Sequence, residues 1–338
     1  MIDSGNPFIN SVIGGSIMAL SSSLHLYLEG KITGISGAIF RCISLSNFSY
    51  NFSFIIGMVF ISSFIKTFFA PSTTFLEKNS KFVENLSISG FALAGFLVGF
   101  GAKMGNGCTS GHGVCGLPRL SKRSFVAISF FMIFGIFMAT LKSSFPFLRP
   151  KSEFKIFEEN NIYYYTFILS SITFLVNAWN AYKKGFFRDI IISFGIGVIF
   201  GYGLIESGML QRHIVIDFLT AGKNWNPQLI FVLGSAVGIN FFTFNFILKK
   251  ISKPRFKEIY DLPMNKIVDN KLCIGASIFG MGWGLAGICP GPAVLTFFLY
   301  PPHITVFFIF LCIGIYLENS FDKKIAELVN RKPTIKFQ

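Results

Sequence analysis

Long apolar stretches recur along the whole chain and determine its fold class. Each is about as long as the ~20 residues that a helix needs to cross a bilayer. The apolar runs are continuous, whereas the strands of an outer-membrane barrel would alternate apolar and polar residues. The pattern therefore predicts an all-α polytopic membrane protein with about nine transmembrane helices, at residues 8–28, 52–70, 88–104, 123–141, 162–180, 189–206, 227–247, 271–288 and 303–319.

Several distinctive positions recur 181 residues apart, which indicates an internal repeat. The offset pairs Cys108 with Cys289, and it also pairs glycines 14 with 195, 99 with 280 and 101 with 282. Five predicted crossings separate the two copies, and because this number is odd the second copy must be inverted relative to the first. Inverted repeats are typical of transporters, whose binding sites form where the repeats meet.

The repeat and the loops together predict four parts of the chain. Residues 8–141 form a first half, and residues 142–188 form an outer loop followed by a connector helix. Residues 189–320 form the second, inverted half, and residues 321–338 form a cytoplasmic tail.

The net charge of +14 indicates membrane topology rather than binding to nucleic acid. Of the 30 Lys and Arg residues, 20 fall in loops on one predicted side, 8 fall on the other side, and two, Lys66 and Lys103, lie within spans. Cytoplasmic loops carry the excess of Lys and Arg in membrane proteins. We therefore expect a multi-pass protein of the cell inner membrane, with its N-terminus outside and its C-terminus in the cytoplasm.

A glycine-rich break surrounds the first cysteine of the repeat. Seven of the eighteen residues from Gly99 to Gly116 are glycine, and each costs about 1 kcal/mol relative to alanine in a helix. Non-helical backbone at membrane depth survives only where it is buried in protein or lines a cavity. We expect Cys108 to lie on an exposed turn, near His112, with the backbone N–H groups of Asn106, Thr109 and Ser110 facing an anion.

The second cysteine lies at a comparable break. Cys289 follows a Gly-rich apolar stretch and precedes Pro290, Gly291 and Pro292. Proline ends one helix and suits the first turn of the next. The topology places the two breaks on opposite sides of the membrane, and in an inverted pair both could dip toward the midplane and meet.

Other chemistry fits these residues less well. His112 with Cys108 and Cys115 could suggest a metal site, but zinc needs a fuller ligand set and no second Cys/His pair accompanies them. A Cys–His nucleophile would need a third group to orient the histidine. We therefore expect no metal, no cofactor and no enzymatic activity. The participation of Cys115 stays open, and Cys42, Cys273 and Cys312 are interpreted as small hydrophobic residues.

Two basic residues occupy equivalent places in the halves, Lys31 and Arg212. Each is either a cation at the end of a span whose charge reaches water or part of a funnel for an anion. Thr33 lies just beyond Lys31 and belongs to the same short segment. The spans show no Asp/Glu pair that would indicate a proton or sodium relay, and Glu206 and Asp217 are the nearest candidates.

At these breaks the chain resembles the YeeE/YedE sulphur-transport family. That resemblance implies an inner-membrane permease with an inverted repeat that takes up thiosulfate past cysteines at the breaks, here Cys108 and Cys289. The two-subunit branch of the family splits the repeat into separate proteins, whereas this chain holds both halves. The matching segments sample residues from about 12 to 320, namely Gly30-Lys-Ile-Thr-Gly-Ile-Ser-Gly37, Gly105-Asn-Gly-Cys-Thr-Ser-Gly-His-Gly113, Ser207-Gly-Met209 and Gly287-Ile-Cys-Pro-Gly-Pro292.

One departure from the family leaves the substrate open. Thiosulfate-importing members have a third cysteine shortly after a Gly-basic pair, and here that position is Thr33. The substrate could thus be thiosulfate or another species such as sulfide, a persulfide or sulfite. Two further alternatives are a membrane sulphurtransferase that carries a persulfide on Cys108 and a scaffold for a soluble partner. The expected partners are the lipid bilayer, the sulphur anion and a cytoplasmic sulphur-accepting protein, which could dock on loop 248–270 and the tail.

Overall fold

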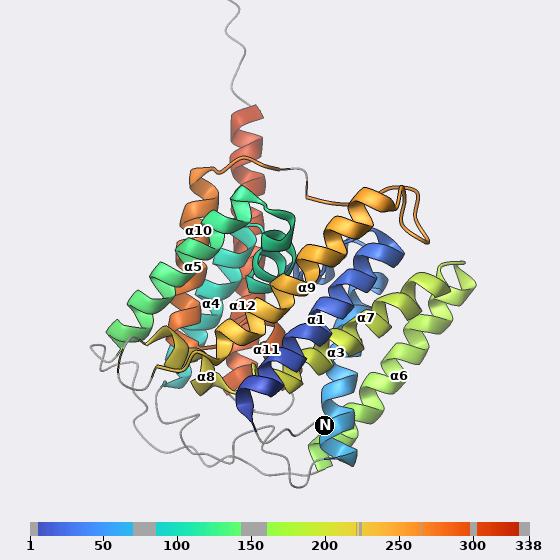
Figure 1. The fold of residues 1–338 in the computed structure, drawn as a ribbon, viewed down its shortest axis with the longest axis horizontal. Helices are drawn as coiled ribbons and strands as arrows, with labels where there is room; N and C mark the ends of the chain where they lie inside the picture. Colours follow the sequence, from blue (N-terminus) through green and yellow to red (C-terminus); the bar gives the residue numbers. More distant parts are fainter. Residues whose placement is uncertain are drawn as a thin grey trace, which may run out of the picture.

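Most of the residues that the computed structural model describes are helical, and no strand occurs among them (Figure 1). These are residues 6–69, 86–142, 161–220, 222, 225–263, 265–297 and 303–330. Nearly all of the predicted outer loop 142–161 and the last part of the predicted tail lie outside them. The helices are α1 (Pro7–Glu29), α2 (Ile35–Ile43), α3 (Phe48–Phe68), α4 (Ile88–Met104), the π-helix η2 (Thr109–Gly116), the 3-10 turn η3 (Leu117–Arg119), α5 (Lys122–Leu141), α6 (Asn161–Lys183), α7 (Phe187–Glu206), α8 (Arg212–Leu219), α9 (Gln228–Lys250), α10 (Asn270–Ala286), α11 (Pro290–Thr296) and α12 (His303–Asn330).

The membrane-spanning pattern differs from the predicted nine spans in one respect. Six of the described helices are long and apolar enough to cross a bilayer, namely α1, α3, α5, α7, α9 and α12. Two bent pairs raise the number to eight if each is one span: α4 with η2 and η3, and α10 with α11. The fifth predicted span, 162–180, lies in α6, which is not among these eight. Polar residues such as Ser170, Ser171, Thr173 and Asn177 dilute its apolar sequence.

The order of the helices repeats with a nearly constant offset. Helices α1, α3, α4 and α5 begin at residues 7, 48, 88 and 122, and helices α7, α9, α10 and α12 begin at 187, 228, 270 and 303. The differences are 180, 180, 182 and 181 residues. The short elements follow the same rule, because α8 takes the place of α2 and α11 takes the place of η2. Among the described α-helices, only α6 has no counterpart.

Equivalent helices run antiparallel, as an inverted repeat requires. Near the start of α1, the Ser11 hydroxyl donates to the carbonyl oxygen of Ser207, just after α7, at 3.4 Å. Further along α1, the Ser21 hydroxyl donates to the carbonyl oxygen of Ile196 at 2.8 Å. The contact therefore moves backward along α7 as it moves forward along α1. Each half also packs on the other in an equivalent way, since α1 lies against α9 and its counterpart α7 lies against α3 (Figure 1).

Helices α4 and α10 cross in the same antiparallel way, and glycine allows their close approach. A Cβ added at Gly101 would collide with the backbone nitrogen of Phe279, and one added at Gly282 would lie 2.8 Å from the carbonyl oxygen of Ala94. Small residues let helix backbones approach closely in membranes, where van der Waals packing replaces the hydrophobic effect. The crossing positions the two bent pairs side by side.

The repeated glycines at 99 and 280 also serve equivalent contacts. A Cβ at Gly99 would collide with the carbonyl oxygen of Leu311 on α12, and one at Gly280 would lie 2.7 Å from the carbonyl oxygen of Phe131 on α5. Helices α12 and α5 are themselves equivalent, so the same contact is made twice. The pair formed by Gly14 and Gly195 differs, because a Cβ at Gly195 would meet no atom within 4 Å.

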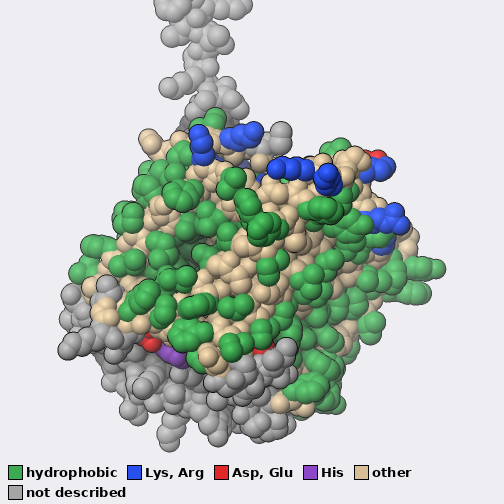
Figure 2. All heavy atoms as spheres, in the orientation of Figure 1, with side chains coloured by type: hydrophobic (Ala, Val, Ile, Leu, Met, Phe, Trp, Pro, Cys, Tyr) green, Lys and Arg blue, Asp and Glu red, His purple; other side chains and the backbone are tan. Residues whose placement is uncertain are grey.

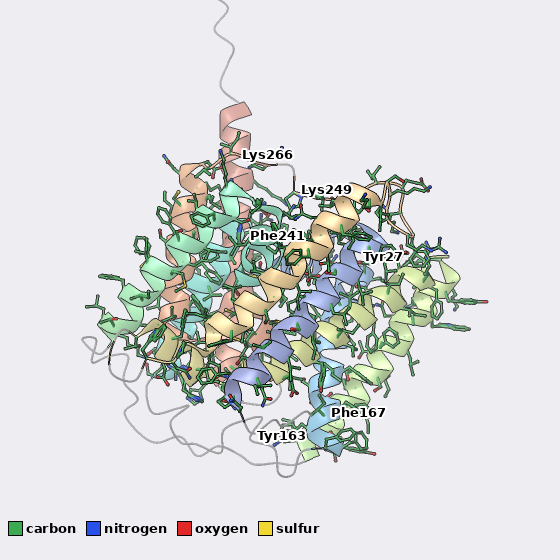
Figure 3. All side chains as sticks on the ribbon, viewed as in Figure 1. Tyr27, Tyr163, Phe167, Phe241, Lys249 and Lys266 are labelled. Carbon is green, nitrogen blue, oxygen red and sulfur yellow. The ribbon has the colours of Figure 1, made fainter. Side chains whose placement is uncertain are left out.

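Charge is distributed unevenly between the two ends of the helices. Lys249 and Lys266 lie at one end of the molecule, and Tyr163 and Phe167 lie toward the opposite end (Figure 3). On the face shown in Figure 2, the Lys and Arg side chains gather at that first end, above a broad hydrophobic surface. Such a hydrophobic surface is typical of helices that face lipid.

Gly99 provides a test of the helix packing. We expect Gly99→Ala to lower the melting temperature in detergent, because the new methyl group overpacks the contact with α12 by about 1–3 kcal/mol. The matched control is Gly195→Ala, which has free space and gains up to about 1 kcal/mol of helix propensity. Thermal melting followed by fluorescence-detected size exclusion would distinguish the two variants. Equal melting temperatures would contradict the close approach of α4 and α12.

Candidate functional site

The first break follows α4 and turns the chain by 46° into η2. Helix α4 starts with a Ser87 cap, whose hydroxyl accepts from the Gly90 N–H at 3.2 Å, and it ends at Met104. Asn106 then adopts a left-handed conformation with φ 58°. A Cβ at Gly107 would lie 2.8 Å from the His112 ring, so only glycine fits against this side chain. The break is therefore built around His112.

His112 supports the break through both of its ring nitrogens. Its Nδ1 lies 3.0 Å from the Ser124 hydroxyl and its Nε2 lies 3.2 Å from the carbonyl oxygen of Gly105. A carbonyl only accepts, so Nε2 carries the proton and the Ser124 hydroxyl donates to Nδ1. The imidazole thereby satisfies a carbonyl at the end of α4, which would otherwise lack a partner.

The second break turns the chain by 43° between α10 and α11. Gly287 ends α10 in a left-handed conformation with φ 69°. The Arg212 side chain is buried and donates from Nε to the carbonyl oxygen of Ala286, the last residue of α10. A cation at a helix C-terminus is favourable. Cys289 follows in extended conformation, and Pro290 occupies the first turn of α11.

The two breaks meet inside the protein. The Thr109 hydroxyl donates to the Cys289 Sγ at 3.3 Å, across 180 residues of sequence. Beside it, the Cys108 Sγ lies 3.2 Å from the Ser110 hydroxyl. Both thiols are almost fully buried, with exposed fractions of 1% for Cys108 and 4% for Cys289. The expectation of an exposed turn at Cys108 is therefore wrong, because the second break packs against it. The structure thus gathers two thiols and two hydroxyls from opposite halves at one place.

The other predicted site residues lie around this meeting point at different depths. Pro290 and Gly291 are buried, and a Cβ at Gly291 would lie 2.7 Å from the Ile35 side chain. Thr33 is also buried, whereas Lys31 is half-buried and Asn106 is exposed. Asn106 thus differs from the two thiols in its exposure to solvent.

The segment from Lys31 to Ile35 docks directly on η2. The Ile35 N–H donates to the Ser110 hydroxyl at 3.2 Å, and the Cys115 Sγ donates to the carbonyl oxygen of Thr33 at 3.3 Å. Cys115 therefore borders the predicted site without contacting the Thr33 hydroxyl. All six cysteines are free thiols.

Two residues that the sequence reasoning missed extend the polar surroundings of Thr33. The His25 Nδ1 lies 2.9 Å from the Thr33 hydroxyl, and its Nε2 lies 2.8 Å from the Tyr50 hydroxyl. A histidine within an apolar span is itself a signal of function. Tyr50 carries no such signal, because tyrosine is common near the ends of spans.

Asn240 is a further missed residue, and it ties α9 to the first break. Its amide nitrogen donates to the carbonyl oxygen of Val114 and to the Ser22 hydroxyl, both at 2.8 Å. Its amide oxygen accepts from the Ser23 hydroxyl at 2.9 Å. The side chain is fully buried. Asn240 thus satisfies a carbonyl of the π-helix that carries Ser110.

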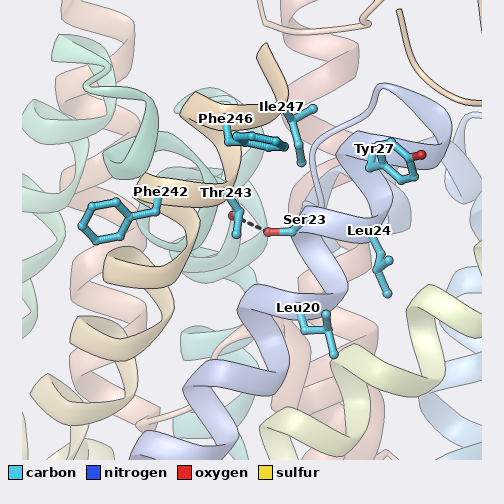
Figure 4. A pocket seen from close by; sticks show the side chains of 8 residues that line it. All are labelled: Leu20, Ser23, Leu24, Tyr27, Phe242, Thr243, Phe246 and Ile247. Carbon is cyan, nitrogen blue, oxygen red and sulfur yellow. Dashed lines mark hydrogen bonds between the residues drawn. The ribbon is translucent and has the colours of Figure 1, made fainter. Parts of the chain in front are cut away.

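A surface groove between α1 and α9 is separate from this site (Figure 4). Its volume is ≈ 360 Å³. Within it, the Ser23 and Thr243 hydroxyls form a hydrogen bond of 2.6 Å. The rest of its lining is mainly apolar and aromatic. Within the described residues, no group of three potential metal ligands occurs in this groove or at the breaks.

Comparison with known proteins identifies the family. Residues 6–138 match the family described as "Sulphur transport", and residues 188–327 match a "Family of unknown function (DUF6691)". A "Probable transporter" of Xylella fastidiosa (strain 9a5c) is 40% identical over 104 residues, which are 30% of this chain and 70% of the relative. The chain belongs to the sulphur-transport family of membrane proteins. A second "Probable transporter", from Xylella fastidiosa strain Temecula1, is 37% identical over 131 residues, 38% of this chain and 90% of the relative.

The first relative is much shorter than this chain. The first relative has about 150 residues, since 104 residues are 70% of its length, so it is less than half as long as this chain of 338 residues. Together with the transporter relatives, the apolar helices show that this chain is a multi-pass membrane protein.

An engineered cysteine can test the meeting of the two breaks. We expect Thr109→Cys to form a disulfide with Cys289 on mild oxidation, because the Thr109 hydroxyl already lies 3.3 Å from that sulphur. Peptide mapping by mass spectrometry would identify the bridge. Gly111→Cys, two residues further along η2, is the control and should leave Cys289 free. A Thr109→Cys protein that stays fully reduced would contradict the described contact.

Proposed function

We propose that this chain is a permease that imports a small inorganic sulphur-containing anion, most directly thiosulfate, past Cys108 and Cys289. The observation that carries this proposal is the meeting of two thiol-bearing breaks from antiparallel halves. Transporters commonly place their sites where inverted repeats meet and where helices are interrupted. The family match and the transporter relatives support the same class of function.

The groups at the meeting point suit a sulphur anion that must bind briefly. A thiol is a weak S–H donor, and the hydroxyls of Thr109 and Ser110 add stronger donors beside the thiols. Conduction requires binding that is weak enough to permit release. Neutral thiols are needed here, because a thiolate would repel the anion.

The two breaks contribute unequally to the stabilisation of charge. The first N–H groups of a helix have no acceptor within the helix, and in η2 these belong to Thr109, Ser110 and Gly111. In α11, Pro290 and Pro292 have no N–H, which leaves Gly291 between them. We infer that the first break supplies most of the charge stabilisation, while Cys289 supplies mainly a soft contact for sulphur.

The charge distribution supports an orientation in which the C-terminal end of α12 faces the cytoplasm. Lys249 and Lys266 lie at the same end as the C-terminal part of α12 (Figure 3). Since Lys and Arg are in excess in cytoplasmic loops, this end faces the cytoplasm in our proposal. The N-terminus then lies outside, and the membrane is the inner membrane of the cell.

Transport is a better account of the site than covalent chemistry. A persulfide carrier on Cys108 would need a base to activate its thiol. The hydrogen-bond partner of the Cys108 Sγ among the described residues is the Ser110 hydroxyl, which is no base at neutral pH. Thr33 offers a hydroxyl at the position where thiosulfate importers carry a thiol. Another sulphur species is therefore the alternative substrate.

Growth on a defined sulphur source tests the permease. A bacterium that lacks its own sulphate and thiosulfate importers should grow on thiosulfate when it expresses this chain. We expect Cys108→Ala and Cys289→Ala to abolish that growth, because each removes a thiol at the meeting point. Cys273→Ala, on the more exposed part of α10, is the control and should leave growth unchanged.

Immunoblots of membranes must show equal amounts of each variant. Full growth of both Cys108→Ala and Cys289→Ala would refute transport past the thiols. Failure of the unmodified chain to support growth, while present in the membrane, would refute thiosulfate as the substrate.

A further inference from the structure

A chain of polar groups continues from the two thiols toward the basic end of the molecule. It begins at Ser110, whose hydroxyl contacts both the Cys108 Sγ and the Ile35 N–H. Thr33 comes next, two residues before Ile35, and His25 joins its hydroxyl to that of Tyr50. Apolar side chains fill most of the surrounding core. The segment from Thr33 to Ile35 thus links the polar groups at the thiols to those around His25.

The end of the line carries a cation above an aromatic ring. The Lys31 ammonium lies 3.6 Å from the centre of the Tyr50 ring, and the Tyr50 hydroxyl on that ring contacts His25. A neutral imidazole has one N–H, so it can donate to only one of its two hydroxyl partners and must accept from the other. Whichever nitrogen holds the proton, either Thr33 or Tyr50 keeps a hydroxyl hydrogen for another acceptor, and the Ser193 hydroxyl lies beside that of Tyr50.

The Lys31 ammonium is only loosely held by its acidic neighbour. Its acidic partner among the described residues is Glu29, with 3.9 Å between Lys31 Nζ and Glu29 Oε2, which is beyond hydrogen-bond distance. Glu29 is buried, and its carboxylate oxygens accept no hydrogen bond from a described residue. The Lys257 ammonium also approaches it, at 3.7 Å, but bonds to Asp189 at 2.6 Å. The cation is therefore available to an anion that offers closer contact.

Free space accompanies this line of groups. A Cβ added at Gly34, Gly37 or Gly111 would meet no atom within 4 Å. Gly34 and Gly37 flank the start of α2, and Gly111 follows Ser110 in η2. These three positions, in the two segments that carry Thr33 and Ser110, are therefore not closed by close packing, unlike Gly99 and Gly101 in α4.

We propose that Lys31, His25, Tyr50 and Thr33 form a second anion-binding station between the thiols and the basic end of the molecule, with Glu29 as the counter-ion that the anion displaces from Lys31. This inference rests on the proposed permease function and extends it. A sulphur anion leaves Cys108 and Ser110, accepts the spare hydroxyl hydrogen of Thr33 or Tyr50, and pairs with Lys31. Because the station requires negative charge, it selects sulphur anions over neutral hydrogen sulfide.

Glu29 has a defined role in this scheme. While the station holds no anion, its carboxylate neutralises Lys31 in a buried setting, where an unpaired charge would be costly. When the anion has arrived, the same carboxylate repels it and favours its release. The charges of Lys31 and Glu29 should therefore affect the apparent affinity for substrate in opposite directions.

Initial rates of radiolabelled thiosulfate uptake into proteoliposomes test the station. We expect Lys31→Gln to raise KM about tenfold, since it removes a charge-assisted contact with the anion. Tyr50→Phe keeps the ring under Lys31 but loses the hydroxyl, and should raise KM by about threefold. Glu29→Gln should lower KM by about threefold. Lys249→Gln is the control, because Lys249 is an exposed lysine at the same end, and it should match the unmodified protein.

The outcomes separate this inference from the proposed function. If Cys108→Ala is inactive but Lys31→Gln and Glu29→Gln both keep the unmodified KM, the station is refuted and the permease stands. If the unmodified protein takes up no thiosulfate, or Cys108→Ala transports normally, the proposed function fails and the station falls with it. Should Lys31→Gln not be monodisperse by size exclusion, the opposite KM shifts of Tyr50→Phe and Glu29→Gln decide the question, and equal shifts overturn the inference.

Discussion

The whole architecture depends on one constraint, that interrupted backbone inside a membrane must find its polar partners within the protein. Two glycine-rich breaks would each leave carbonyl and N–H groups exposed to hydrocarbon. His112 satisfies the carbonyl of Gly105, Arg212 satisfies that of Ala286, and Asn240 satisfies that of Val114. These three side chains make the interruptions affordable at membrane depth. Since all three partners come from within the protein, the breaks need no polar contact with lipid.

The inverted repeat supplies the geometry that brings the breaks together. Antiparallel crossing of α4 and α10 places the end of α4 beside the start of α10, and glycines at the crossing let the backbones touch. The segments after the two helices then meet at Thr109 and Cys289. Cys108 and Cys289 each occupy the residue before the second piece of a bent pair. One local sequence feature, a break with a cysteine, occurs once in each half. The antiparallel arrangement brings its two copies together at one place. The site is still asymmetric, because η2 begins with free N–H groups and α11 begins with prolines.

Much of the fold could be predicted from the sequence, because apolar length and glycine-rich breaks have direct physical meaning in a membrane. The two bent segments lie where Cys108 and Cys289 indicated. The span at 162–180 was harder, since the polar residues of α6 weaken its signal. His112 shows the limit of motif reasoning, because its support of Gly105 depends on a backbone turn that spacing does not reveal. Glu29 and Tyr50 were missed for a similar reason. Their importance comes from contacts with Lys31 and His25, which only the packing of α1, α2 and α3 creates.

The central claim is that a sulphur anion passes the point where the two thiols meet. The most direct measurement is a high-resolution cryo-electron microscopy structure of the protein in lipid nanodiscs with saturating thiosulfate, compared with one prepared without it. The account predicts additional density in contact with Cys108, Thr109 and Cys289. Density for the anion found only elsewhere, for example in the groove between α1 and α9, would contradict it.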